Sequence, residues 1–288
     1  MPPKKKTKTN RDDYIHQRFV GSTSKYEPIP ETISTSSNRT NWFKDRKKKK
    51  LAEIETLSGK HDESSRAELR DAYHELGFLQ GLRMADILKR FTRQRRDTTW
   101  YWEEELSEMS FVMIPRVFAE EIKKIMLEEM QNRVSVEDYV SSQETFGGAA
   151  HVYIMNAGQK ATSNGVGLQS CPVLWGFLDG VKESMGWLDK HLVDVNVITS
   201  VSEEARQEDA EVLKWHCDMN ECHLLPQVRD LTHPKWPLTL YFPLEEGRSS
   251  TFIFQPNRGS RGRRPTPKEI TVNKDAVLLF ETCTFYHA

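Results

Sequence analysis

A succession of short apolar segments separated by turn-forming residues constrains the fold of this chain more than any other feature. The apolar segments lie at 193–198, 211–218, 238–242, 250–254, 269–272 and 276–280. Loops that contain Gly, Pro, Asn or charged residues connect them, and β-branched and aromatic side chains are frequent within them. Short strands at such spacing are typical of an antiparallel sandwich or barrel. The second half of the chain therefore predicts a mainly β domain.

Helical spacing of apolar residues dominates the preceding part of the chain. Helices are predicted at 64–96, 119–131 and 174–188, with short strands at 111–114 and 151–155. Two glycines, Gly77 and Gly81, fall inside the first helix and are expected to weaken or split it. We therefore predict three parts: a disordered basic tail at 1–62, a helical segment at 63–107, and a β domain at 108–288.

The charges are distributed unevenly along the chain. Residues 1–50 carry fourteen Lys and Arg against five Asp and Glu, although the whole chain has a net charge of -1. Basic runs at 4–6 and 46–50 are typical of a nuclear address or a nucleic-acid contact. A solvated, disordered tail without a partner is the alternative that composition leaves open.

Four cysteines are few for a chain of 288 residues. No apolar run reaches the roughly 18 residues of a membrane span, and the N-terminus has no signal-peptide core. The sequence thus predicts an intracellular protein of the nucleus or cytoplasm, with free thiols and no membrane partner. Composition does not predict the oligomeric state.

The residues that carry most chemical information are His216 and Asp218. Side chains two residues apart on a strand point to the same face, so this imidazole and carboxylate would lie side by side. They form part of a ferrous-iron site, which normally takes two His and one carboxylate and leaves positions open. The best candidate for the missing imidazole is His287, 71 residues after His216. That interval leaves room for the strands that would bring a late strand beside an early one.

The order of these segments resembles the 2-oxoglutarate- and iron(II)-dependent dioxygenases, in particular the prolyl-hydroxylase-like branch. The resemblance covers about residues 108–288, and the order and spacing of its motifs are more specific than any single motif. The matching pieces are Trp215-His216-Cys217-Asp218, Thr239-Leu240-Tyr241-Phe242, Gly247-Arg-Ser-Ser-Thr251-Phe252, the apolar segment 274–280 that leads to Tyr286-His287-Ala288, and the opening segment 111–118 before a helix.

The resemblance implies a double-stranded β-helix, a jelly-roll or cupin-like core with flanking helices. It implies Fe(II) held by His216, Asp218 and His287, 2-oxoglutarate as cosubstrate and ascorbate as an accessory reductant. Tyr241 and Thr251 are the expected cosubstrate contacts by motif position, and Lys214 is a further one because it shares the strand face of His216. The implied reaction hydroxylates a C–H bond of a protein side chain or nucleobase.

The sequence departs from the family pattern in three places. The basic residue that holds the far carboxylate of 2-oxoglutarate follows the second His in the family, whereas this chain ends at Ala288. The family's Gly-Gly-Glu-Thr appears as Gly-Arg-Ser-Ser-Thr251, and its Tyr-Leu-Asn segment as Tyr241-Phe242-Pro243. We therefore expect the β domain to be incomplete at its C-terminus, as it would be if this sequence were part of a longer enzyme.

Several alternatives remain open. Cys217 and Cys222, flanked by His216 and His223, contain ligands that zinc favours, although no second Cys/His pair has finger-like spacing. A nucleophile-elbow Gly-x-Ser-x-Gly is absent from the sequence. A non-catalytic barrel bound to nucleic acid through its basic tail is the alternative function. The arginine-rich loop at 258–264 could contact nucleic acid, or it could be an ordinary solvated loop. The aromatic run at 100–102 could stack on bases, or it could belong to the core.

Overall fold

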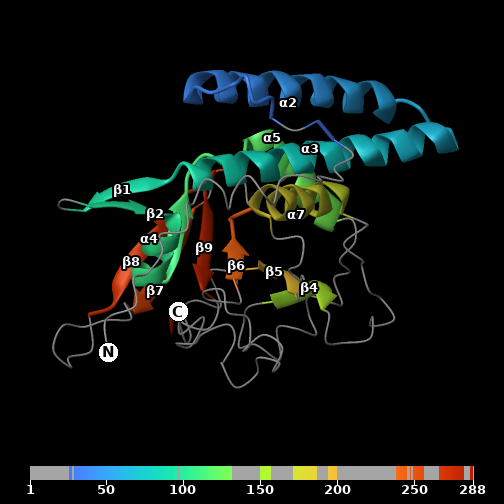
Figure 1. The fold of residues 1–288 in the computed structure, drawn as a ribbon. Helices are drawn as coiled ribbons and strands as arrows, with labels where there is room; N and C mark the ends of the chain where they lie inside the picture. The colour runs from blue at the N-terminus through green and yellow to red at the C-terminus, as the bar shows by residue number, and fades with distance from the viewer. Residues whose placement is uncertain are drawn as a thin grey trace, which may run out of the picture.

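Four stacked layers, two helical and two of β-sheet, make up most of the described chain (Figure 1). The structure is a computed structural model. It describes residues 26–27, 29–95, 98–131, 150–156, 171–186, 194–199, 238–244, 247, 249–255, 266–281 and 286–287.

The outer helical layer consists of α2, which lies along α3. Helix α2 spans Ser36–Ser58 and α3 spans Glu63–Lys89. Helix α7, Pro172–Met185, packs along the other side of α3, and α5, Glu120–Gln131, contacts both α2 and α7 (Figure 1). Helices α5 and α7 cover one face of a sheet. Cys171 leaves the first turn of α7 without a side-chain cap of its own. A carboxylate from α5 takes this role, because the backbone N–H of Val173 donates to Oε2 of Glu129 at 3.2 Å.

Two three-stranded antiparallel sheets form the remaining layers. The first sheet has the order β3-β9-β6, with β3 at Phe111–Ile114, β9 at Val277–Glu281 and β6 at Leu238–Tyr241. The second sheet has the order β10-β7-β8, with β10 at Tyr286–His287, β7 at Ser250–Gln255 and β8 at Lys268–Val272. From β6 onward the described strands alternate between the sheets, and only β7 and β8 follow each other within one sheet.

Strand β9 separates two apolar cores because all five of its residues are buried. Val277 and Leu279 pack with the helices, whereas Leu278 and Phe280 pack with the second sheet. This alternation is the period of two that a strand imposes on its side chains. The strand therefore holds the helical layers on one face and the second sheet on the other.

The predicted strands at 111–114, 238–242, 250–254, 269–272 and 276–280 are confirmed to within one or two residues at each end. The expected strands at 151–155 and 193–198 also form, as β4, Ala150–Asn156, and β5, Asp194–Thr199, which pair with each other. Mixed helices and antiparallel sheets are thus present, in several small sheets.

Gly77 and Gly81 do not split α3, contrary to the sequence prediction. They face Gly176 and Gly180 of α7 at a close crossing of the two helices. A Cβ atom on Gly77 would lie 1.9 Å from the carbonyl oxygen of Val173, and one on Gly176 would lie 1.9 Å from that of His74. Glycine is needed at these positions because the two backbones are in contact.

The prediction of a disordered segment at 1–62 is wrong for the residues of α2. Thr35 caps this helix, with Oγ1 accepting from the backbone N–H of Asn38 at 3.2 Å. Phe43, Ile54 and Leu57 are its buried residues, so its apolar face is sparse and gives little periodic signal in the sequence. Polar contacts with distant parts of the chain complete its attachment to α3.

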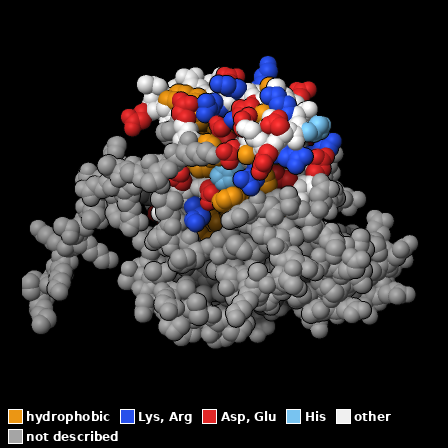
Figure 2. Space-filling model, turned by 90° about the vertical axis from the view of Figure 1, so that its right-hand side faces the viewer, with side chains coloured by type: hydrophobic (Ala, Val, Ile, Leu, Met, Phe, Trp, Pro, Cys, Tyr) orange, Lys and Arg blue, Asp and Glu red, His pale blue; other side chains and the backbone are white. Residues whose placement is uncertain are grey.

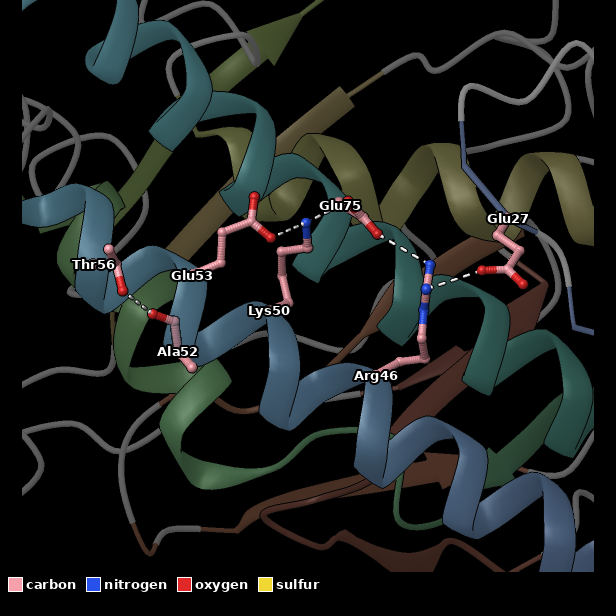
Figure 3. A network of polar contacts seen from close by, with 7 residues as sticks. All are labelled: Glu27, Arg46, Lys50, Ala52, Glu53, Thr56 and Glu75. Carbon is pink, nitrogen blue, oxygen red and sulfur yellow. Dashed lines mark hydrogen bonds and ion pairs between the residues drawn. The ribbon is translucent and has the colours of Figure 1, made fainter.

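Ion pairs join α2 to α3 in a ladder that Figure 3 displays. Arg46 pairs with Glu27 at 2.9 Å and with Glu75 at 3.4 Å, and Lys50 pairs with Glu75 at 2.6 Å and Glu53 at 2.7 Å. All partners except Glu53 come from outside α2. These long-range contacts stabilise a helix whose own sequence looks like a solvated tail.

The sequence predicted a helical segment at 63–107, but only part of this segment is helical. Helix α3 ends at Lys89, and a two-stranded hairpin follows, β1 at Thr92–Arg95 and β2 at Thr98–Tyr101. A short helix, α4, then spans Trp102–Met109. Three threonines, Thr92, Thr98 and Thr99, and the aromatic pair Trp100 and Tyr101 favour strands here over continuation of the helix.

Candidate functional site

The described part of the predicted site centres on Tyr241, at the end of β6. Its hydroxyl donates a hydrogen bond to Oγ of Ser250 on β7 at 2.6 Å. Its ring packs edge-on against Phe252, with the ring centroids 4.7 Å apart. Burial raises the pKa of the Tyr241 hydroxyl, and the hydrogen bond to Ser250 offsets only part of that rise. The phenol is therefore a neutral hydrogen-bond donor that joins the two sheets.

His287 lies in β10, opposite Phe254 of β7 in the strand register. Residues directly opposite each other on paired strands occupy the same face of a sheet. Phe254 is only 2% exposed and packs edge-on against Phe111 of the first sheet at a centroid distance of 4.9 Å. Position 287 thus belongs to the face of the second sheet that is directed toward the first, as does Ser250.

Thr251 lies on the other face of β7. Its cross-strand neighbour is Thr271, and both residues are exposed, as is Ile253 two residues further along. The strand period of two separates Thr251 from Ser250 and therefore from the Tyr241 hydroxyl. The expected contact of Thr251 with a cosubstrate beside Tyr241 does not agree with this arrangement.

Ser250 is the site residue that sequence reasoning missed. The resemblance pointed to Thr251 by motif position and did not consider which side chains of the strand point inward. Phe252 and Phe254 lie on the inward face of β7, and position 250 lies on the same face because side chains alternate along a strand. The pattern of large apolar residues within the strand could therefore have identified Ser250 from the sequence.

The other predicted site residues lie outside the described residues. These are His216, Asp218 and Lys214, together with Cys217, Cys222 and His223 of the zinc alternative and the loop at 258–264. Within the described ranges no group of three or more His, Cys, Asp or Glu side chains could hold a metal ion. Of the proposed ligands these ranges include His287 alone, as a backbone position.

The surroundings of the Tyr241–Ser250 pair are apolar. Phe252, Ile270, Phe254 and Val272 of the second sheet pack there with Leu278 and Phe280 of β9. In such surroundings a hydrogen bond from a neutral hydroxyl to an anionic oxygen is stronger than in water. The arrangement can therefore orient a carboxylate at the end of β6.

The basic run at 46–50, predicted as a nuclear address or nucleic-acid contact, lies within α2. Arg46 and Lys50 take part in the ladder to α3, and Lys47 pairs with Glu121 of α5. The hydrogen bond from Lys47 holds the pKa of the Glu121 carboxyl below its usual range. On the face in Figure 2, Lys and Arg side chains are interspersed with Asp and Glu. Three of the five basic residues of this run therefore stabilise the fold.

The aromatic run at 100–102 is divided between the surface and the core. Tyr101 is 39% exposed, whereas Trp100 is half-buried. Trp102 is half-buried as well and packs against the core between the helices and the first sheet. Both predicted environments, a surface platform and a core cluster, thus occur within three residues.

Comparisons with known proteins do not assign a family. No family model, no curated protein and no solved structure matches this chain. None of the helices in the described residues is long and apolar enough to span a membrane.

Proposed function

We propose that this protein is an Fe(II)- and 2-oxoglutarate-dependent oxygenase that hydroxylates a C–H bond, with a double-stranded β-helix as its catalytic domain. The observation that carries the proposal is the position of β7 between β10 and β8. Position 287 and Ser250, which accepts a hydrogen bond from Tyr241, lie on the same face of the second sheet. Tyr241 and His287 are 46 residues apart in the sequence.

The strand order supports the fold part of the proposal. A jelly roll consists of two facing antiparallel sheets between which the chain passes repeatedly. The passage from β6 to β7, from β8 to β9 and from β9 to β10 changes the sheet each time. An apolar core lies between the two sheets, as expected if they face each other; it contains Leu278, Phe280, Phe254 and Val272.

The donor set supports the metal part of the proposal. Two imidazoles and one carboxylate suit Fe(II) and leave coordination positions open for a cosubstrate and dioxygen. His216, Asp218 and His287 would hold the metal, which together with 2-oxoglutarate supplies the oxidising chemistry. On cosubstrate binding the Tyr241 hydroxyl would transfer its one hydrogen bond from Ser250 to a cosubstrate carboxylate, and the aromatic residues around it would exclude water.

The test of this function is succinate formation from 2-oxoglutarate by the protein supplied with Fe(II) and ascorbate. We expect His216→Ala, Asp218→Ala and His287→Ala each to abolish succinate formation, because each leaves an incomplete iron site. The exposed His61, between α2 and α3, offers a matched control, and His61→Ala should leave the rate unchanged. Activity that survives in any ligand variant would contradict the assigned site, and a folded wild-type protein without activity would favour the non-catalytic alternative.

A second variant pair tests the role of Tyr241. Tyr241→Phe removes only the hydroxyl, and the loss of one hydrogen bond to a charged group should raise the KM for 2-oxoglutarate about tenfold. Thr251→Val serves as the control because Thr251 lies on the exposed face of β7, and its KM should stay within about twofold of wild type. An equal effect of both changes would show that Tyr241 has no special contact.

A further inference from the structure

A basic surface that the proposed oxygenase site does not include lies at the end of α3. We call residues 89–95 and 98–101 the basic ribbon; they comprise the last residue of α3, the connection to β1, and strands β1 and β2. Four Lys and Arg and no acidic residue lie in these two ranges. In Figure 1 the hairpin extends away from the stacked layers, beyond the end of α3. Its two strands are therefore accessible to a large partner.

Two arginines of the ribbon are anchored while they remain exposed. Arg90 pairs with Asp86, and its side chain is 38% exposed. Arg93 pairs with the buried carboxylate of Glu105, and its side chain is 54% exposed. A guanidinium group has five N–H donors, so one ion pair leaves donors for a second anion. Anchoring also lowers the entropy lost when that anion binds.

The ribbon combines these charges with an aromatic ring and short polar side chains. Tyr101 is 39% exposed and lies across from Thr92 in the strand register. On the same face, Nε2 of Gln94 donates to Oγ1 of Thr99 at 2.8 Å. Arg93 lies on the opposite face, across from Trp100. A polymer that contacts both Arg93 and Tyr101 must therefore pass over an edge of this two-stranded ribbon.

We propose that the basic ribbon binds single-stranded nucleic acid. Lys and Arg side chains would contact the phosphates, and the ring of Tyr101 would stack on a base. Phosphate contacts beside an exposed aromatic side chain are the combination that proteins use for single strands without sequence preference. An acidic peptide would use the charges but not the ring. The ribbon is distinct from the Tyr241 site, so this binding does not depend on the oxygenase reaction.

Helix α2 provides an internal contrast to the ribbon. Lys44, Lys48 and Lys49 of α2 are exposed, yet Asp45 lies among them and no exposed aromatic residue accompanies them. A variant without these three lysines has the same net charge as one without three basic residues of the ribbon. The two variants therefore separate a local binding surface from a general effect of charge.

The experiment measures fluorescence anisotropy of a labelled single strand of about 20 nucleotides with the full chain, between about 50 and 300 mM NaCl. The ribbon variant combines Lys89→Gln, Arg90→Gln and Arg95→Gln, and the control combines Lys44→Gln, Lys48→Gln and Lys49→Gln. The ribbon variant should bind about tenfold or more weakly, with the salt slope smaller by about 2, since each lost phosphate contact reduces the slope by about 0.7. The control should bind within about twofold of wild type. Asp86 keeps Arg39 as a partner in the ribbon variant, so α3 should stay folded.

A second pair tests stacking. Tyr101→Leu should weaken binding about fivefold or more, whereas Tyr101→Phe keeps the ring and should bind like wild type. Equal losses in the two charge variants, or no loss in the ribbon variant, would overturn the proposal. The same holds if Tyr101→Leu binds like wild type, or if a duplex binds more tightly than the single strand, because stacking on an exposed ring requires unpaired bases.

Discussion

The helical layers and the two-sheet region are held together by different interactions. Helices α3 and α7 meet through backbone contact at four glycines, and α2 is attached to α3 by ion pairs together with the buried side chains of Phe43, Ile54 and Leu57. The sheets instead enclose an apolar core in which Leu278 and Phe280 have almost no exposed surface. The stability of the helical region therefore depends on particular pairs of distant residues, while that of the sheet region depends on a repeated local pattern of apolar residues.

The strongest test of this contrast is a single methyl group at the α3–α7 crossing. Gly77→Ala would place Cβ 1.9 Å from the carbonyl oxygen of Val173, so one helix must move away from the other. We expect the free energy of unfolding to fall by about 3 kcal/mol or more in urea denaturation. Gly59→Ala is the matched control, since a Cβ atom there has no neighbour within 4 Å and φ is -79°. A small effect at Gly77 would contradict the close crossing.

The next largest effect is expected between the sheets. Leu278→Ala removes a fully buried side chain from the inter-sheet core and should lower the free energy of unfolding by about 3 kcal/mol. Ile253→Ala changes the outer face of β7, where the side chain is 45% exposed, and should cost less than about 1 kcal/mol. If both changes cost the same in urea denaturation, the two sheets do not enclose a core between Leu278 and Phe254.

These differences explain how much of the structure the sequence could predict. The strand segments at 111–114, 250–254 and 276–280 were predictable because alternation and β-branched residues are local signals. Docking of α2 was not predictable, since Arg46 and Lys50 look like a solvated basic run until Glu75 is brought beside them. Gly77 and Gly81 likewise acquire their meaning only from α7. At the candidate site, the role of Tyr241 as a cosubstrate contact stays a prediction from its motif, whereas its hydrogen-bond partner Ser250 required the register of β7.

The ion-pair ladder should have a moderate, salt-dependent effect. Glu75→Gln removes the carboxylate that pairs with both Arg46 and Lys50, and we expect a loss of about 1 kcal/mol at low salt. In about 1 M NaCl the difference from wild type should largely vanish, because salt screens partly exposed charges. Glu55→Gln, an exposed change on α2, is the control in the same denaturation series. A loss independent of salt would mean that packing, not charge, accounts for the effect.

The smallest expected effect on the free energy of unfolding concerns Tyr26, which contacts α3, and it appears at alkaline pH. The Tyr26 hydroxyl lies 2.9 Å from Nδ1 of His74, and burial, followed by the nearby Asp71, Glu75 and Asp179, raises the Tyr26 pKa above its ordinary value of 10.0. A raised pKa means that the folded state favours the protonated phenol. This contribution to stability is present below about pH 10 and is lost as the pH rises further.

Tyr26→Phe tests this dependence. The free energy of unfolding of wild type should fall between about pH 10 and 11, and the variant should fall less steeply because it lacks the titrating phenol. Lys50, whose pKa is raised because hydrogen bonds to Glu53 and Glu75 outweigh its desolvation, adds a decline of the same sign in both proteins. Identical slopes for the two proteins would contradict a buried phenol at position 26.

The proposed function depends on an iron site that His216, Asp218 and His287 build in the sheet region. The most direct measurement is anomalous X-ray scattering from crystals grown with Mn(II), a redox-stable ion for the same ligands, and 2-oxoglutarate. We expect a single metal peak within bonding distance of these three side chains, on the side of β7 that carries Ser250. A peak bound by Cys217, Cys222 and His223, or no metal beside β10 in a crystal saturated with Mn(II), would contradict it.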